Sequence, residues 1–386
     1  MGAIRLILAL SVTVWHVGGD APFRMLNAGV AVLLFFVISG FYMALVINEK
    51  YARGDEPWLA TFYRARVLRL GPTYLAFLLI IIAWSTWTGS PNAFTQSPPE
   101  YVWWQRAGLV ALNLFVAGQD LFQLVIMATQ QHNGAEYVAG IRDALSPSYF
   151  DGSMMLIGQA WSLSSEIFFY ALAPFIVRSP LRIIALLAAS LAVRWLLVGY
   201  LGLFSGIWGY WFFPATLCFF LMGALAYHLH RIVAPYPQSI TIGWVALGFM
   251  AVWFVLLIAA NGIILPDGPA WSMDLPRFWC AYIAFAAGVP FIFSATKWFK
   301  ADRFIGELSY PLYLSHGLVL GICFIVLGYD RSTMTGFALA IGSSLAAAVL
   351  LRVCVEWPTE SWERRSPPSR RVRFAPIVLQ KSEIAR

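Results

Sequence analysis

Charged residues are scarce in this chain of 386 residues. Asp, Glu, Lys and Arg make up 12% of the sequence and hydrophobic residues 60%, whereas an average soluble domain is about a quarter charged and about half apolar. Apolar stretches of about 20 residues recur along almost the whole length, and each is long enough to cross a bilayer core as a helix. The composition argues against several soluble domains and predicts one polytopic membrane domain.

Cysteine and histidine are also rare, and the chain shows no CxxC or Cys/His spacing typical of a metal site. A secretory cleavage site is missing after the apolar run 4–17, which favours a retained first helix over a signal peptide. No internal repeat is visible, and this weakens a transporter built on inverted repeats.

The formal charge of +7 does not indicate nucleic-acid binding, because the basic residues form short clusters between apolar runs. Such clusters mark the cytoplasmic side of a membrane protein. We therefore expect the loops 49–69, 178–182 and 297–303, and the basic C-terminal end from Arg352, to lie in the cytoplasm.

The hydrophobic runs predict an all-α polytopic membrane protein with about ten transmembrane helices and both termini cytoplasmic. The predicted transmembrane domain is residues 1–358, and residues 359–386 form a basic cytoplasmic tail that is expected to be disordered. The expected spans are residues 4–19, 28–48, 70–88, 160–177, 183–201, 210–229, 240–260, 278–296, 304–327 and 333–353.

The apolar run 107–127 is long enough to span but contains several polar residues: Asn113, Gln119, Asp120 and Gln123. If this run crossed the membrane, the later basic loops would face outward, against the positive-inside rule. We therefore predict a re-entrant or interfacial helix within a long external segment, 89–159. Half-inserted backbone needs surrounding protein or a water-filled cavity, so the assignment implies a cavity.

His16 follows Arg5 by close to three helical turns, so both side chains share one face of the first predicted helix, about 16 Å apart. An ionisable residue within a membrane span is a functional hypothesis by default, because leaving it unpaired in hydrocarbon is costly. The structural alternative is an interfacial histidine beside Trp15 and an arginine that only anchors the helix.

Glu166 stands in the polar cluster WSLSSE, which opens an otherwise apolar helix. There a carboxylate feels the positive end of the helix dipole and can pair with a histidine. A helix-start acid of the capping-box kind is the alternative. In the predicted topology Glu166 and His16 both lie at external helix ends, where they could share one cavity.

Tyr313 and His316 are three residues apart and share a helix face within a span. They either line a polar substrate path or only hydrogen-bond a neighbouring helix.

Arg64, Arg66 and Arg69 precede Gly71-Pro72 at the cytoplasmic mouth. Guanidinium groups bind phosphate bidentately, so the cluster could hold a polyphosphate cofactor. Anchoring by the positive-inside rule is the alternative.

Six fragments resemble the acyltransferase 3 family of membrane-bound O-acyltransferases, and they occur in that family's order from end to end. They are RLILALSVTVWH (5–16), GVAVLLFFVISGF (29–41), RVLRLGPTY (66–74), WSLSSEIFFY (161–170), LSYPLYLSH (308–316) and VEWP (355–358).

The resemblance implies an acyl-coenzyme A donor on the cytoplasmic side and an acceptor hydroxyl on a sugar or other envelope molecule. It implies that His16 is the catalytic histidine, with Arg5 as its partner on the donor path. We expect Glu166 to orient the imidazole of His16 or to stabilise its cation. The donor-binding residues would be Arg66, Arg69, Arg64, Ser39 and Tyr74. The substrate-binding residues would be Trp161, Ser164, Tyr310, Tyr313 and His316.

These expectations describe an enzyme that moves an acyl group, with acetyl as the default, from acetyl-CoA to a carbohydrate or lipid-linked glycan acceptor. The expected location is the lipid of a bacterial inner membrane; the sequence also allows a homo-oligomer, and it indicates neither a metal nor nucleic acid. The alternative is a transporter that exports a lipid-linked or anionic solute, with His16, Glu166 and Arg194 as a proton or substrate path.

Overall fold

The computed structural model describes residues 1–18, 21–52, 58–90, 102–130, 132, 134–145, 155–264, 274 and 276–365. Within these ranges the chain is helical and has no strand, which confirms the predicted all-α class. Seven helices are long and apolar enough to cross a membrane, or eight if one bent pair counts as a span. Two other expected spans, 4–19 and 160–177, coincide with helices of 16 residues, which fall short of that length. The expected span 240–260 lies within a helix of 27 residues, Gln238–Ile264.

The helices are α1 (Gly2–Val17), α2 (Ala28–Val46), α3 (Leu59–Thr88), α4 (Trp103–Phe115), α5 (Gln119–Gln130), α6 (Ala135–Leu145), α7 (Trp161–Ile176), α8 (Pro180–Arg194), α9 (Ser205–Trp208), α10 (Phe213–Val233), α11 (Gln238–Ile264), α12 (Pro276–Thr296), α13 (Lys300–Glu307), α14 (Ser309–Gly321), α15 (Met334–Leu351) and α16 (Trp357–Arg365). Turns of π-helix extend several of them: η1 (Ile47–Tyr51), η4 (Trp195–Tyr200), η5 (Ile322–Val326) and η6 (Arg352–Glu356).

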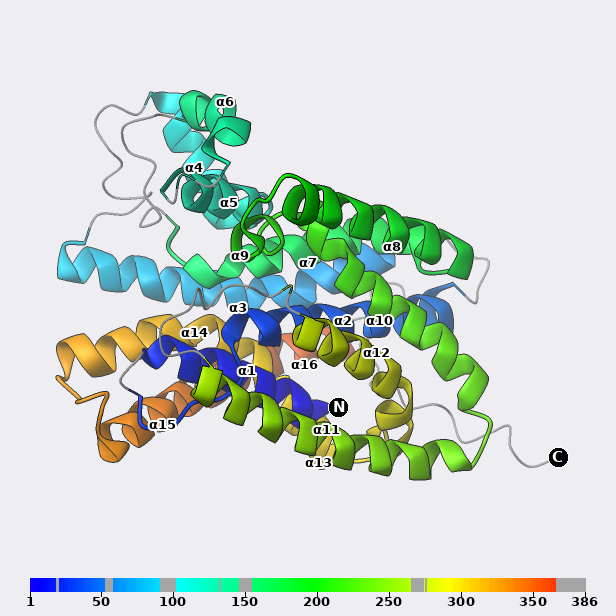
Figure 1. Cartoon of the computed structure of the whole chain (residues 1–386). Coiled ribbons are helices and arrows are strands. Elements are labelled where there is room, and N and C mark those ends of the chain that lie inside the picture. The colour runs from blue at the N-terminus through cyan, green and yellow to red at the C-terminus, as the bar shows by residue number, and fades with distance from the viewer. Residues whose placement is uncertain are drawn as a thin grey trace.

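The centre of the bundle is α2, which lies among the long helices in Figure 1 and is the most buried candidate span. It packs closely on α10 through two glycines. A Cβ on Gly40 would lie 1.8 Å from the carbonyl oxygen of Phe220, and one on Gly223 would lie 1.9 Å from that of Val37. Small residues let membrane helices approach backbone to backbone, so these glycines set the spacing of α2 and α10.

The start of α1 is fixed by α13. The Asp302 carboxylate accepts hydrogen bonds from the backbone amides of Gly2 and Ala3, both at 2.8 Å. These amides have no partner within their own helix, so a carboxylate there satisfies them and meets the positive end of the helix dipole. The contact fixes where Arg5, one turn further on, enters the bundle.

The run 107–127 does not form one straight helix. It is divided between α4 and α5, which are bent by 119° at Val116, a residue with φ of 67°. These helices and α6 form the group at the upper left of Figure 1. Two polar residues of the run are buried and bonded within the protein: the Asn113 side chain accepts from the Leu156 amide at 2.9 Å, and Asp120 accepts from Ser164 at 2.8 Å.

Two predicted boundaries differ from the structure. α3 begins at Leu59 and not at residue 70, so Arg64, Arg66 and Arg69 lie on a helix and not in a loop. Residues 359–365, predicted as tail, belong to α16; the rest of the predicted tail, 366–386, lies outside the described residues.

Candidate active site

A cavity of about 720 Å³ opens between the helices near the N-terminus of α1. α1, α2, α3, α7, α13 and α14, together with the segment from η6 into α16, contribute to its wall. It brings together predicted site residues from distant motifs: Arg5, Ser39, Arg66, Arg69, Glu166, Tyr310 and Tyr313. No residue of the run 107–127 lines this cavity, so it is not the one that the re-entrant assignment implied.

Three cations on this wall, Arg5, Arg66 and Arg69, have no carboxylate bonded to them among the described residues. Among the residues that the structure describes, the guanidinium groups of Arg5 and Arg69 make neither an ion pair nor a hydrogen bond. Arg66 approaches the Met43 sulfur at 3.9 Å, and its buried Nε has no partner. Guanidinium groups that face an open volume without carboxylates form a ready site for an anion, phosphate above all.

A second cavity of about 150 Å³ continues this basic region towards Lys297 and shares Arg5, Arg69 and Arg303 with the first. Lys297 follows the end of α12, and burial lowers the pKa of its ammonium group. Removal from water lowers the pKa of an ammonium group when no carboxylate compensates for the lost hydration. Both cavities therefore present positive charge to any ligand.

Glu166 lies on the same wall but is not paired with the arginines. Its carboxylate accepts a hydrogen bond from the Tyr170 hydroxyl at 2.9 Å, one turn further along α7. Arg5 and Arg69 are near enough to act on it electrostatically. Glu166 thus belongs to the basic region, and the structure shows no contact between it and His16 among the described residues.

The closure, a hydrogen-bonded pair of wall residues, Ser162 of α7 and Tyr313 of α14, joins these two helices. The Tyr313 hydroxyl lies 2.7 Å from the Ser162 hydroxyl and donates to the Gln159 carbonyl at 3.1 Å. The Gln159 side chain in turn donates to the Leu314 carbonyl at 2.6 Å.

Beyond this closure lie two histidines in contact. The rings of Tyr313 and His316 have centroids 5.9 Å apart, and those of His316 and His16 are 4.9 Å apart with an interplanar angle of 49°. His316 is buried, whereas the His16 side chain is exposed. A row of rings therefore connects the cavity wall to His16.

Hydrogen bonds fix the tautomer of each histidine. Nδ1 of His16 lies 2.7 Å from the Val12 carbonyl oxygen, and Nδ1 of His316 lies 2.7 Å from that of Tyr313. Because a carbonyl only accepts, Nδ1 carries the hydrogen in each neutral ring. Nε2 of His16 is then left with a lone pair, as a general base or nucleophile requires.

The acyltransferase domain model of the acyltransferase 3 family matches residues 1–353. The chain belongs to that family. Membership supports acyltransferase activity, and together with the apolar helices it makes the protein a membrane-bound acyltransferase. No curated protein and no solved structure matches the chain significantly.

Some predicted site residues of this acyltransferase lie away from the cavity. Tyr74 donates to the Asn113 carbonyl at 2.5 Å, and Ser164 joins Asp120 to the Gly118 amide. Trp161 packs on Tyr210 with ring centroids 4.4 Å apart. Arg64 is exposed on the opposite side of α3 from Arg66 and Arg69. All four are absent from the cavity wall.

Arg194, the third member of the transporter alternative, is separated from His16 and Glu166. It forms a bidentate ion pair with Asp274 at 2.6 and 3.0 Å and donates to the Gly209 carbonyl at 2.6 Å. The partners satisfy a charge that would otherwise be costly at membrane depth. These bonds give Arg194 a structural role, because they link α8 to the start of α12.

The acyltransferase cavity also contains residues that were not predicted as site residues: Lys50, Arg303, Glu307, Arg352, Trp357 and Glu360. From sequence alone, Lys50, Arg303 and Arg352 indicate only the cytoplasmic side. The spacing of Arg303 and Glu307, one turn apart on α13, could have placed them on one face. Within the described part of the chain, no group of three or more His, Cys, Asp or Glu side chains could hold a metal.

Proposed function

We propose that this protein transfers an acyl group, acetyl in the simplest case, from cytoplasmic acyl-CoA to a hydroxyl of a sugar or another cell-envelope acceptor. The observation that carries the proposal is one cavity with three arginines that lack carboxylate partners, Arg5, Arg66 and Arg69, at one end. A histidine with a free Nε2 lies beyond its other end. The arginines would bind the coenzyme A phosphates, and the pantetheine arm would lead the thioester towards His16.

The distance between the two ends suits such a donor. Arg5 and His16 lie on the same face of α1, about three turns or roughly 16 Å apart. A donor held by its phosphates at Arg5 must therefore carry its reactive carbon on a long, thin arm. To reach His16, the thioester has to pass the hydrogen-bonded closure made by Tyr313 and Ser162.

In the chemical step, Nε2 of His16 accepts the proton of the acceptor hydroxyl as its oxygen attacks the thioester carbonyl carbon. The carbon–sulfur bond breaks, and the coenzyme A thiolate leaves and takes up a proton. In the two-step variant, Nε2 itself attacks and carries the acyl group to the acceptor. His316 supports the His16 ring by direct contact, and Glu166 balances the charge of Arg5 and Arg69 before the donor arrives.

We place the arginine end of the cavity in the cytoplasm and propose ten membrane crossings with both termini on that side. The buried hydrogen bonds of Asn113 and Asp120 support a re-entrant α4–α5 pair, because polar groups at membrane depth must be satisfied by protein. A bacterial inner membrane fits an acceptor in the cell envelope. Cysteine-accessibility labelling tests the arrangement: a cysteine at residue 178 should react only from the cytoplasm and one at residue 332 only from outside.

The activity is tested with purified protein and radiolabelled acetyl-CoA. Slow release of free coenzyme A without acceptor, and faster release with a suitable glycan, is expected of the wild-type protein. His16→Ala should abolish both the slow and the faster release of coenzyme A. A transporter should release no coenzyme A, either as wild-type protein or as the His16→Ala variant. Mass spectrometry of surface glycans from a deletion strain would then identify the acceptor by the acetyl groups that it loses.

A further inference from the structure

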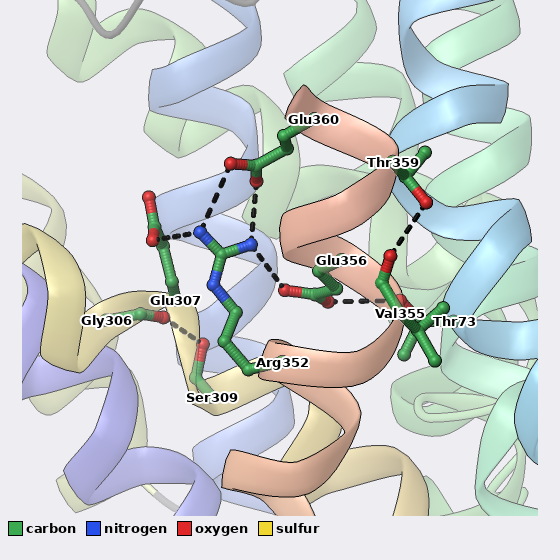
Figure 2. Close-up of polar contacts among 9 residues, drawn as sticks. All are labelled: Thr73, Gly306, Glu307, Ser309, Arg352, Val355, Glu356, Thr359 and Glu360. Carbon is green, nitrogen blue, oxygen red and sulfur yellow. Dashed lines mark hydrogen bonds and ion pairs between the residues drawn. The ribbon is translucent and has the colours of Figure 1, made fainter. Parts of the chain in front are cut away.

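One wall of the cavity is built around a buried arginine that no step above uses. Figure 2 shows the Arg352 guanidinium surrounded by Glu307, Glu356 and Glu360. Its NH1 atom lies 3.0 Å from Glu356 and 2.7 Å from Glu360, and NH2 binds both Glu307 and Glu360. A guanidinium that is satisfied by carboxylates on every side is not available to a phosphate.

The cluster joins three parts of the chain. Arg352 and Glu356 belong to η6, Glu360 to α16 and Glu307 to α13, while Glu356 also accepts a hydrogen bond from Thr73 of α3 at 3.2 Å (Figure 2). Thr73 is one turn from Arg69 on the same face of α3. The network therefore fixes the start of α16 beside the arginines of the cavity.

The residue placed there is Trp357, the first of α16. Its indole lines the cavity and is 58% exposed. Among the residues that the structure describes, Trp357 has neither a ring contact nor a hydrogen-bond partner. Its indole is therefore open to a ligand at the edge of the cavity.

The charges of the wall are divided in a way that suits a nucleotide. Arg5, Arg66 and Arg69 attract phosphates, whereas one guanidinium among three carboxylates leaves the Arg352 cluster negative and repels them. Carboxylate oxygens accept hydrogen bonds from N–H groups such as the exocyclic amine of a purine. A flat aromatic ring beside such acceptors suits a purine base, because every base has a face that stacks on an aromatic side chain.

We propose that Trp357 stacks on the adenine of the donor and that Arg352 is a positioning residue that holds the indole in place. The inference rests on the proposed function, since it takes coenzyme A as the ligand. The base would lie at the cytoplasmic mouth against α16, the phosphates at the arginines and the thioester near Tyr313. The donor would thus be recognised at its nucleotide end and not only by its charge.

The test compares coenzyme A with 4′-phosphopantetheine, which lacks the adenylate portion, by calorimetric binding to full-length protein. Trp357→Ala should weaken coenzyme A binding about tenfold, within the range measured for base stacking on an aromatic ring. The affinity for 4′-phosphopantetheine should stay within about twofold, because that ligand has no base to stack. Trp357→Phe, which keeps a stacking face, should restore most of the affinity for coenzyme A.

Trp298 provides the matched control. Its side chain is 54% exposed, a fraction similar to the 58% of Trp357, but it is absent from the wall of either cavity. Trp298→Ala should therefore change the affinity for neither ligand. Equal losses for both ligands in Trp357→Ala would show that Trp357 only supports the fold and would overturn the inference. If folded wild-type protein binds coenzyme A and 4′-phosphopantetheine equally, the inference is wrong but the proposed function stands. If it binds neither ligand, both the inference and the proposed function are wrong.

Discussion

The imidazole of His16 on α1 rests against that of His316 on α14, with ring centroids 4.9 Å apart. Each ring donates from Nδ1 to a carbonyl of its own helix, which leaves both Nε2 atoms without hydrogen in the neutral state. When His16 takes a proton at Nε2, the adjacent neutral ring can help to stabilise the imidazolium. The contact therefore joins the residue proposed for catalysis to a second helix that also lines the donor cavity.

Replacement of His16 is expected to be the most damaging single change to activity. His16→Ala and His16→Gln should each lower acetyl transfer by at least about a hundredfold, the usual range for a general acid–base group. Coenzyme A affinity should be unchanged, because His16 lies outside the cavity wall. His132→Gln, at an exposed position, is the control, and full activity in both His16 variants would contradict the mechanism.

Charge reversal on α3 should weaken the donor site. Arg66→Glu and Arg69→Glu should each lower coenzyme A affinity by about ten- to a hundredfold, since a charge-assisted hydrogen bond contributes roughly 1.5–3 kcal/mol. Arg64→Glu is the matched control, because it makes the same charge change on the same helix but faces away from the cavity. Calorimetric titration would decide, and equal losses in all three variants would indicate a general electrostatic effect.

The inner closure of the cavity can be measured by a double-mutant cycle. Tyr313→Phe and Ser162→Ala both remove the 2.7 Å hydrogen bond, so each should destabilise the fold by about 1 kcal/mol. The double variant should lose less than the sum, with a coupling of about 0.5–1 kcal/mol. The measurement is unfolding of the detergent-solubilised protein, and additive losses would mean that the two hydroxyls do not interact.

Arg194 should matter for stability and not for the donor. Arg194→Ala leaves the half-buried Asp274 carboxylate without its ion-pair partner, and the loss should be smaller than the roughly 3–5 kcal/mol typical of a fully buried pair. We expect a lower unfolding temperature together with normal coenzyme A affinity in the protein that remains folded. Loss of transport or transfer without any loss of stability would instead support a functional path through Arg194.

The sequence alone determined the membrane class and the all-α fold, because these depend on the length and polarity of single segments. A helix in lipid satisfies its own backbone, so an apolar run of sufficient length is enough to predict one. The sequence also determined which polar residues needed an explanation, and six short motifs predicted the family. Helical periodicity predicted one shared face of α1 for Arg5 and His16, and it placed Arg66 and Arg69, which both line the cavity, on one face of α3.

Only the tertiary structure decided which residues face one another. It placed Glu166 beside Arg5 and Arg69 and gave His16 a neighbour, His316, from the far end of the chain. It also moved Arg352 from a predicted basic end of the chain into a carboxylate cluster on the cavity wall. Periodicity gives the face on which a side chain lies, but the partner of that face depends on how distant helices pack, which close contacts such as that between Gly40 and Phe220 fix.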